Sequence, residues 1–262
     1  MLTASWVDIT SNARIKEYPL FSVMQVASDY IFREPGYEPR KRLYDVPPKG
    51  EAIDPERSKL NSLCRARTAV RDIALCNNFE YFFTFTLSAE FVNRYDPIEV
   101  GRKLQTFLRN VSYRKGFQYV CVPENHKDGA IHFHGLCNLG TVQIERALNY
   151  HTDFPLSTNR GQPVFNMIDW KLGYSTCIPL DENYEVACNY IVKYLSKGCD
   201  KILGKWYLAS RNLVKRPHIS IVDGGTSFED FCTDNPTAPV VSIYRDVRMA
   251  IMRLPDESEG NA

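Results

Sequence analysis

The sequence predicts an α+β domain: a central sheet of about five strands, antiparallel or mixed, with helices packed on it. Two observations carry this prediction. Segments with helix and strand periodicity alternate along residues 56–222. Two of the strands flank the turn Asp128-Gly129, the sharpest hairpin signal in the chain, and must therefore be antiparallel.

The first periodic segments are a helix, a strand and a second helix. Apolar residues spaced near 3.6 residues predict a helix from about Pro55 to Asn77. The segment Tyr81 to Leu87 is dense in aromatic and β-branched residues and predicts a strand. Asp96 as N-cap and Pro97 at the first helical position predict a helix that runs to about Tyr113.

The rest of the domain continues the alternation. The expected elements are a strand over 117–123, a turn over 125–129, a strand over 130–138, a helix over 141–150, a polar connection over 151–166, a strand over 174–178, a helix over 181–197, and short structure or a fifth strand over 206–211 and 219–222. Helical crossovers would place the helices on one face of the sheet, as in ferredoxin-like folds and RNA-recognition modules.

The two ends of the chain differ from this domain. Residues 1–55 are rich in turn formers and show no clear period, which predicts an irregular N-terminal arm. Residues 223–262 form a C-terminal extension that we expect to be partly flexible. The domain proper is therefore expected over residues 56–222.

Composition restricts the class of protein. The chain has 262 residues, 44% of them hydrophobic, and a net charge of +1, so a nucleic-acid partner would need a local basic face. No run approaches the ~18 apolar residues of a membrane span, and no secretory signal opens the chain. The eight cysteines include no C-x-x-C pair, which argues against a zinc knuckle and favours a cytoplasmic protein with reduced thiols.

The segment Ile131 to Leu136 carries two histidines one residue apart. In a strand, His132 and His134 would point to the same face, and the hairpin would bring Glu124 beside them. Two imidazoles and one carboxylate suit Mg²⁺ or Mn²⁺ and can hold Zn²⁺. His126, in the turn, is a rival third ligand. An isolated His-x-His pattern is more often a surface feature, so the metal hypothesis depends on the rest of the chain.

A second motif lies in the last predicted helix, where Tyr-x-x-Lys occurs twice in succession. Tyr190 and Tyr194 would share one helical face, with Lys193 and Lys197 repeating the same offset. A phenol with its usual pKa of about 10 is a weak nucleophile, but a nearby ammonium and a metal-polarised phosphate would make attack feasible. The alternative is an amphipathic helix whose tyrosines pack on the sheet.

Together these motifs resemble those of the HUH endonucleases that initiate rolling-circle replication of single-stranded DNA phages and small plasmids. The strand Phe83 to Leu87 is similar to their first motif, Glu124 with His132-Phe133-His134 to their metal motif, and Tyr190 to Lys197 to their tyrosine motif. The doubled tyrosine resembles the two-tyrosine branch. The resemblance spans about residues 57–220 and implies the HUH-endonuclease fold.

The resemblance implies an enzyme that nicks and rejoins single-stranded or hairpin origin DNA through a 5′-phosphotyrosine, with Mg²⁺ or Mn²⁺ held by Glu124, His132 and His134. Tyr190 would attack first and Tyr194 second. Lys193 would orient or neutralise the phosphate. Other candidate DNA contacts are basic residues outside these motifs and Lys197 within the last one: Arg65, Arg67, Arg71, Lys127 and Lys197. Thr84 and Thr86 would face the DNA or the second shell of the metal.

The same resemblance implies partners in the cytoplasm of a bacterial host. The segment from Gly198 to Gly204-Lys205 is one residue too long for a phosphate-binding loop, and Trp206 follows the lysine. We therefore expect no helicase domain and a need for a host helicase and polymerase. Two alternatives stay open: an HUH transposase or relaxase with the same chemistry, and a non-catalytic nucleic-acid-binding module.

Overall fold

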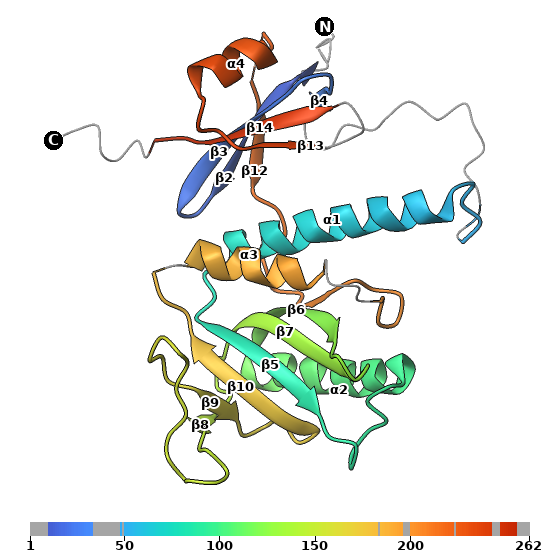
Figure 1. The fold of residues 1–262 in the computed structure, drawn as a ribbon, viewed down its shortest axis with the longest axis vertical. Coiled ribbons are helices and arrows are strands. Elements are labelled where there is room, and N and C mark those ends of the chain that lie inside the picture. Colours follow the sequence, from blue (N-terminus) through green and yellow to red (C-terminus); the bar gives the residue numbers. More distant parts are fainter. Residues whose placement is uncertain are drawn as a thin grey trace, which may run out of the picture. The chain divides into compact units, whose positions relative to one another are not determined.

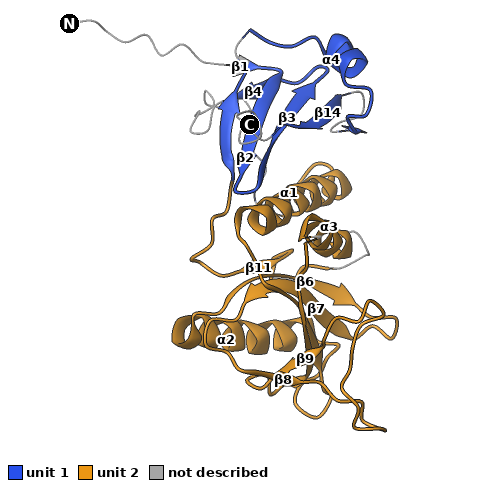
Figure 2. Ribbon diagram, turned by 90° about the vertical axis from the view of Figure 1, so that its left-hand side faces the viewer, with its two compact units in different colours: residues 1–48, 217–262 blue, residues 49–216 orange. Residues whose placement is uncertain are grey.

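The computed structural model describes residues 10–33, 48, 50–182, 184–195, 200–222, 224–242 and 247–255. The chain divides into two compact units, residues 1–48 with 217–262 and residues 49–216 (Figure 2). The fold is α+β, as predicted, with an antiparallel sheet in each unit. No helix in these ranges is long and apolar enough to cross a membrane.

The larger unit is built on a seven-stranded antiparallel sheet in the order β11-β6-β7-β5-β10-β9-β8 (Figure 1). Its strands are β5 (Tyr81–Leu87), β6 (Gln118–Asn125), β7 (Ile131–Asn138), β8 (Ile144–Arg146), β9 (Phe165–Met167), β10 (Gly173–Pro179) and β11 (Leu208–Ala209). Four strands predicted from the sequence are thus confirmed as β5, β6, β7 and β10, and the expected short strand over 206–211 is β11.

Three helices accompany this sheet: α1 (Pro55–Cys76), α2 (Pro97–Lys115) and α3 (Tyr184–Tyr194). Asp54 caps α1 by accepting a hydrogen bond from the Arg57 N–H, and Asp96 caps α2 by accepting from the Ile98 N–H. A proline opens each of these two helices, as the sequence predicts for α2.

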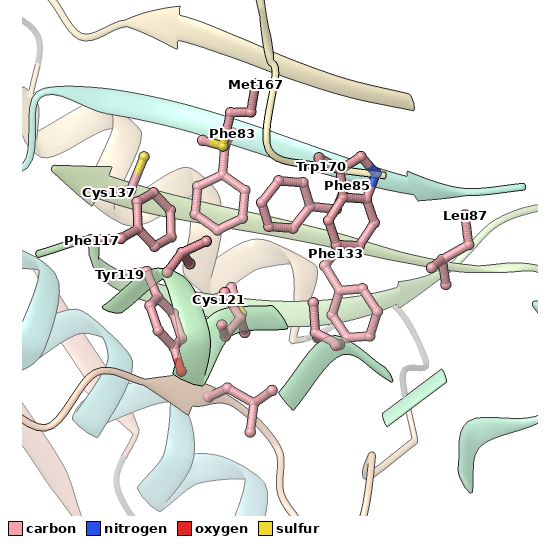
Figure 3. Packing of buried hydrophobic residues seen from close by; sticks show 14 of the residues in the cluster. Phe83, Phe85, Leu87, Phe117, Tyr119, Cys121, Phe133, Cys137, Met167 and Trp170 are labelled. Atoms are coloured by element: carbon pink, nitrogen blue, oxygen red, sulfur yellow. The ribbon is translucent and has the colours of Figure 1, made fainter. Parts of the chain in front are cut away.

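Helices cover both faces of the sheet, which corrects the expectation of helices on one face. On one face, Phe83 and Phe85 of β5 and Phe133 of β7 pack with Leu104 and Leu108 of α2 (Figure 3). Against the other face lies α3, which contacts β6 and β7 and packs in turn on α1. The central strands carry buried apolar residues on that face too, among them Val122 and Leu136, and these require a cover.

The predicted helix over 141–150 is wrong. This segment forms β8 and turns, because Val142 and Ile144 alternate as in a strand and pack on the core of the sheet. β8 pairs with β9, which lies at the end of the segment expected to be a polar connection. Tertiary packing here overrides a weak helical pattern.

The smaller unit shows that the two chain ends fold together. A five-stranded antiparallel sheet has the order β12-β2-β3-β14-β13, and β1 pairs with β4. Its elements are β1 (Thr10–Ser11), β2 (Ala13–Tyr18), β3 (Phe21–Ala27), β4 (Phe32–Arg33), β12 (His218–Ile221), α4 (Phe228–Asp234), β13 (Val240–Ser242) and β14 (Arg248–Arg253). Ala13, Val26, Phe228, Phe231 and Ala250 form its core.

Two expectations are therefore corrected. Residues 10–33 are strands rather than an irregular arm, and residues 218–221 pair with β2 rather than extending the sheet of the domain. The pairing of β3 with β14 joins residues more than two hundred positions apart, and no local pattern reveals such a contact. The tail from residue 256 onward lies outside the described residues.

Candidate active site

Two cross-strand rows organise one face of the larger sheet. In the first row Glu124 pairs with His132, His132 with Thr86, and Thr86 with Tyr174. In the second row His134 pairs with Thr84, and Thr84 with Thr176. Directly paired residues share a face, so both histidines project to the side of the sheet on which α3 lies.

His134 is held at both ring nitrogens. Its Nε2 lies 2.7 Å from Glu124 Oε2, and its Nδ1 lies 3.1 Å from Thr84 Oγ1. Only 9% of the residue is exposed, and Glu124 is half-buried. The hairpin predicted from Asp128-Gly129 thus brings the carboxylate against the second histidine of the motif. Hydrogen bonds at both nitrogens fix the orientation of the ring.

His132 lies in a similar setting one row away. Its Nδ1 is 3.3 Å from Thr86 Oγ1, and the ring of His126 stacks on it with centroids 5.0 Å apart. Burial, together with the charge of His126, lowers the pKa of His132, which favours the neutral imidazole that a metal ligand must be. His126 itself is exposed and pairs with Asp128, so the rival third ligand lies on the rim.

The two tyrosines of α3 meet as their spacing predicts. The hydroxyl of Tyr194 donates a hydrogen bond to that of Tyr190 at 2.8 Å, with ring centroids 5.0 Å apart. The ring of Tyr194 stacks on His134, and Phe82 of β5 lies beside both Tyr190 and His134. Tyr190 is 46% exposed and Tyr194 only 6%, so Tyr190 is the accessible phenol. Burial, and then the bond to Tyr190, raise the pKa of Tyr194.

One residue anchors α3 in this position. The hydroxyl of Tyr184, at the start of α3, lies 2.6 Å from the carbonyl of Ala74 and also contacts the carbonyl of Asn77, at the end of α1. The Phe79 N–H donates to the same hydroxyl at 3.2 Å. Burial raises the pKa of Tyr184. The anchor matters because α3 carries both tyrosines.

The remaining predicted residues lie outside this cluster. Lys193 is exposed on α3, Lys127 is exposed in the turn between β6 and β7, and the other described ones lie on α1: Arg65 and Arg67 exposed, Arg71 half-buried. Within the described ranges, none of these five bonds to the histidines, to Glu124 or to the tyrosines. Lys197 lies outside the described residues.

Sequence reasoning missed Phe82 and Tyr174 as neighbours of the site. The alternation of β5 places Phe82 on the same face as Thr84, and this signal was available from the sequence. The place of Tyr174 follows only from the pairing of β10 with β5.

The donors present suit a hard divalent cation. The 2.7 Å between His134 Nε2 and Glu124 Oε2 is close to the ~3 Å that separates adjacent ligand atoms of an octahedral ion with ~2.1 Å bonds. His132 lies on the same face, directly paired with Glu124. In the part of the chain that the structure describes, no three His, Cys, Asp or Glu side chains are yet arranged around one point, so a bound ion would require His132 to turn toward the other two.

Comparison with known proteins adds one finding. A family model described as replication-associated protein ORF2 matches residues 80–199. The matched segment runs from just before β5 to beyond α3 and includes Glu124, both motif histidines and both tyrosines. Comparisons with curated proteins and with solved structures gave no similar chain. The family match supports a replication initiator.

Proposed function

We propose that this chain initiates rolling-circle replication as an HUH endonuclease of the two-tyrosine branch, nicking and rejoining single-stranded or hairpin origin DNA through a 5′-phosphotyrosine. One observation carries the proposal: the ring of Tyr194 stacks on His134, which bonds to Glu124, while the exposed phenol of Tyr190 lies alongside. The match to replication-associated proteins supports the biological setting.

Glu124, His132 and His134 would hold the divalent ion, Mg²⁺ or Mn²⁺. When bound, the ion supplies Lewis-acid polarisation of a phosphoryl oxygen. Thr84 and Thr86 contact the Nδ1 atoms of the two histidines. If each hydroxyl accepts from Nδ1–H, the Nε2 lone pair of each ring is left to face the ion.

The reaction exchanges one phosphodiester for another. The Tyr190 oxygen attacks phosphorus in line with the leaving 3′ oxygen, so the Tyr–O–P bond forms as the P–O3′ bond breaks. The phenol proton is lost to solvent, and the 3′ oxygen takes up a proton to become the free 3′-OH that primes synthesis. Lys193, on the same helix, offsets phosphate charge.

Tyr194 is suited to a second, later attack. Its hydroxyl is bonded to that of Tyr190, so it lies next to the phosphotyrosine once Tyr190 has reacted. Attack by Tyr194 at the regenerated origin would release a new 3′-OH, which then displaces Tyr190 from the first phosphate and closes the displaced strand. No net cofactor is consumed, because each step conserves a phosphodiester.

Binding of the DNA backbone is assigned to basic residues around the site. Arg65, Arg67, Arg71 and Lys127 would supply salt-sensitive, sequence-independent contacts, with Lys197 next to the tyrosine motif. A host helicase and polymerase in the bacterial cytoplasm would unwind the template and extend the primer.

A covalent-adduct assay tests the proposal. A single-stranded DNA library, labelled at either end, is incubated with the protein and Mn²⁺, and adducts are separated under denaturing conditions. We expect the 3′-end label to stay with the protein and the 5′-labelled fragment to be extendable by a polymerase. Sequencing the retained strands would return the origin.

Three variants and one control sharpen the assay. Tyr190→Phe, Tyr194→Phe and the double variant remove the proposed nucleophiles, whereas Tyr113→Phe changes an exposed tyrosine of α2, which packs on the opposite face of the sheet. The adduct should persist in Tyr113→Phe and vanish in the double variant. Absence of any adduct from the unaltered protein, or its survival in the double variant, would refute the proposal.

A further inference from the structure

A small polar pocket lies at the edge of the sheet, beyond the cluster of histidines and tyrosines. It measures about 180 Å³ and lies where β9 and β10 separate. The residues that line it include Glu145 of β8, Asn166 of β9, and Lys171, Tyr174 and Ser175 in or next to β10. The volume is below the ~300–1,000 Å³ of pockets for drug-sized ligands, so it suits a single ring rather than a whole cofactor.

The pocket connects directly to the candidate active site. Tyr174 stands in the same cross-strand row as Thr86, His132 and Glu124, on the same face of the sheet. Two strand spacings of ~4.8 Å separate it from His132. With 46% of its surface exposed, the ring of Tyr174 offers a flat surface beside the place where the phosphate would be cut.

Asn166 gives the pocket an unsatisfied acceptor. Its side-chain oxygen Oδ1 is buried and has no hydrogen-bond partner in the structure. A buried amide oxygen without a donor is costly, and native proteins rarely keep one without a purpose. Glu145 pairs with Asn166 across β8 and β9 and adds a carboxylate at the rim. Both groups call for a ligand that brings N–H donors.

We propose that this pocket is a nucleobase subsite that takes a base with an exocyclic amino group, adenine or cytosine, from the strand being cut. The base stacks on Tyr174 and its amino group donates to Asn166 Oδ1, while Lys171 lies near the backbone phosphate. The ligand class rests on the proposed function. The subsite itself adds sequence preference next to the scissile phosphate, since stacking tolerates any base and the hydrogen bond does not.

Equilibrium binding without metal tests the subsite separately from cleavage. Fluorescein-labelled homopolymers of deoxyadenosine, deoxycytidine and thymidine, equal in length, are titrated with the full chain and followed by anisotropy. We expect binding to deoxyadenosine or deoxycytidine about tenfold tighter than to thymidine, and the comparison of the first two identifies the base. Equal affinities for all three would overturn the proposal.

Substitutions assign the preference to residues. Asn166→Leu should abolish it while leaving thymidine binding unchanged, and Asn166→Asp, which keeps an acceptor, should retain it. Tyr174→Ala should weaken binding of every homopolymer about tenfold, against no change in the control Tyr113→Ala. A preference that survives in Asn166→Leu would overturn the proposal.

Thermal unfolding separates this role from a structural one. Because Asn166 Oδ1 has no partner, Asn166→Leu should leave the melting temperature unchanged or raise it. A large decrease would assign Asn166 to the fold and overturn the subsite. An Asn166-dependent preference in a protein that forms no adduct would refute only the proposed function, whereas an adduct without any preference would refute only the subsite.

Discussion

The ring of Tyr194 lies flat on the imidazole of His134, with centroids 3.9 Å apart and planes 9° apart. This contact joins helix α3 to strand β7, whose residues are 60 positions distant in sequence at these two sites. It places a buried phenol over a histidine that already bonds Glu124. The accessible phenol of Tyr190 is then positioned by its hydrogen bond to Tyr194.

The two tyrosines should differ in their effect on the first cleavage. Tyr190→Phe removes the exposed phenol and should reduce the initial rate of adduct formation at least ~100-fold. Tyr194→Phe removes a buried hydroxyl and should reduce that rate less, while blocking strand closure. Single-turnover kinetics on the selected origin strand measure both. A larger effect of Tyr194→Phe on the first step would reverse the assignment.

Metal affinity should depend on the carboxylate that touches His134. Glu124→Gln keeps the shape but removes the charge, and should weaken Mn²⁺ binding more than tenfold by calorimetry. A matched control exists in Glu17→Gln, since Glu17 pairs with exposed His218 in the smaller unit. Unchanged Mn²⁺ affinity in Glu124→Gln would exclude Glu124 as a ligand and favour His126.

The threonines behind the histidines should tune that affinity. Thr84→Val and Thr86→Val remove the partners of the two Nδ1 atoms, and loss of such a partner typically costs ~10–100-fold in metal affinity. Thr176→Val is the control, because Thr176 pairs with Thr84 on the same face without contacting a histidine. Equal effects of all three substitutions would indicate a general disturbance of the sheet.

Gly135, the residue after the second histidine, should not tolerate a side chain. An added Cβ would overlap the ring of Phe83 and lie 2.7 Å from the carbonyl oxygen of Val120. Gly135→Ala should therefore lower the free energy of unfolding by ~2 kcal/mol or more, measured in urea. Gly161→Ala meets no atom and should cost only ~1–2 kcal/mol for its left-handed backbone.

The anchor of α3 should be sensitive to alkali. Tyr184→Phe leaves the carbonyls of Ala74 and Asn77 without their donor and should destabilise the fold by ~1–3 kcal/mol. The raised pKa of Tyr184 means that the folded state keeps its proton while the unfolded chain ionises, so its contribution is full below about pH 10 and is lost as pH rises above that.

Urea unfolding at about pH 8 and about pH 11 measures this effect. The decrease in stability between the two pH values should be smaller in Tyr184→Phe than in the unaltered protein. Tyr119, whose pKa is also raised by burial, accounts for part of the remaining decrease. An identical decrease in both proteins would show that Tyr184 does not contribute.

Local patterns in the sequence determined the elements of the larger unit and the composition of the site. Capping residues placed the starts of α1 and α2, aromatic and β-branched residues placed β5, and Asp128-Gly129 placed the hairpin that carries Glu124 back to the histidines. These signals act over a few residues, so they can be read without the fold. The Tyr-x-x-Lys repeat likewise fixed the two tyrosines on one helical face.

Only the tertiary structure decided what depends on distant partners. The pairing of β10 with β5 brings Tyr174 into line with His132, and packing of α3 on β7 sets Tyr194 against His134. The chain ends form one sheet because β3 and β14 complete each other's hydrogen bonds and share a small core. Such contacts depend on which faces remain to be buried once the elements exist, and no short stretch of sequence contains that information.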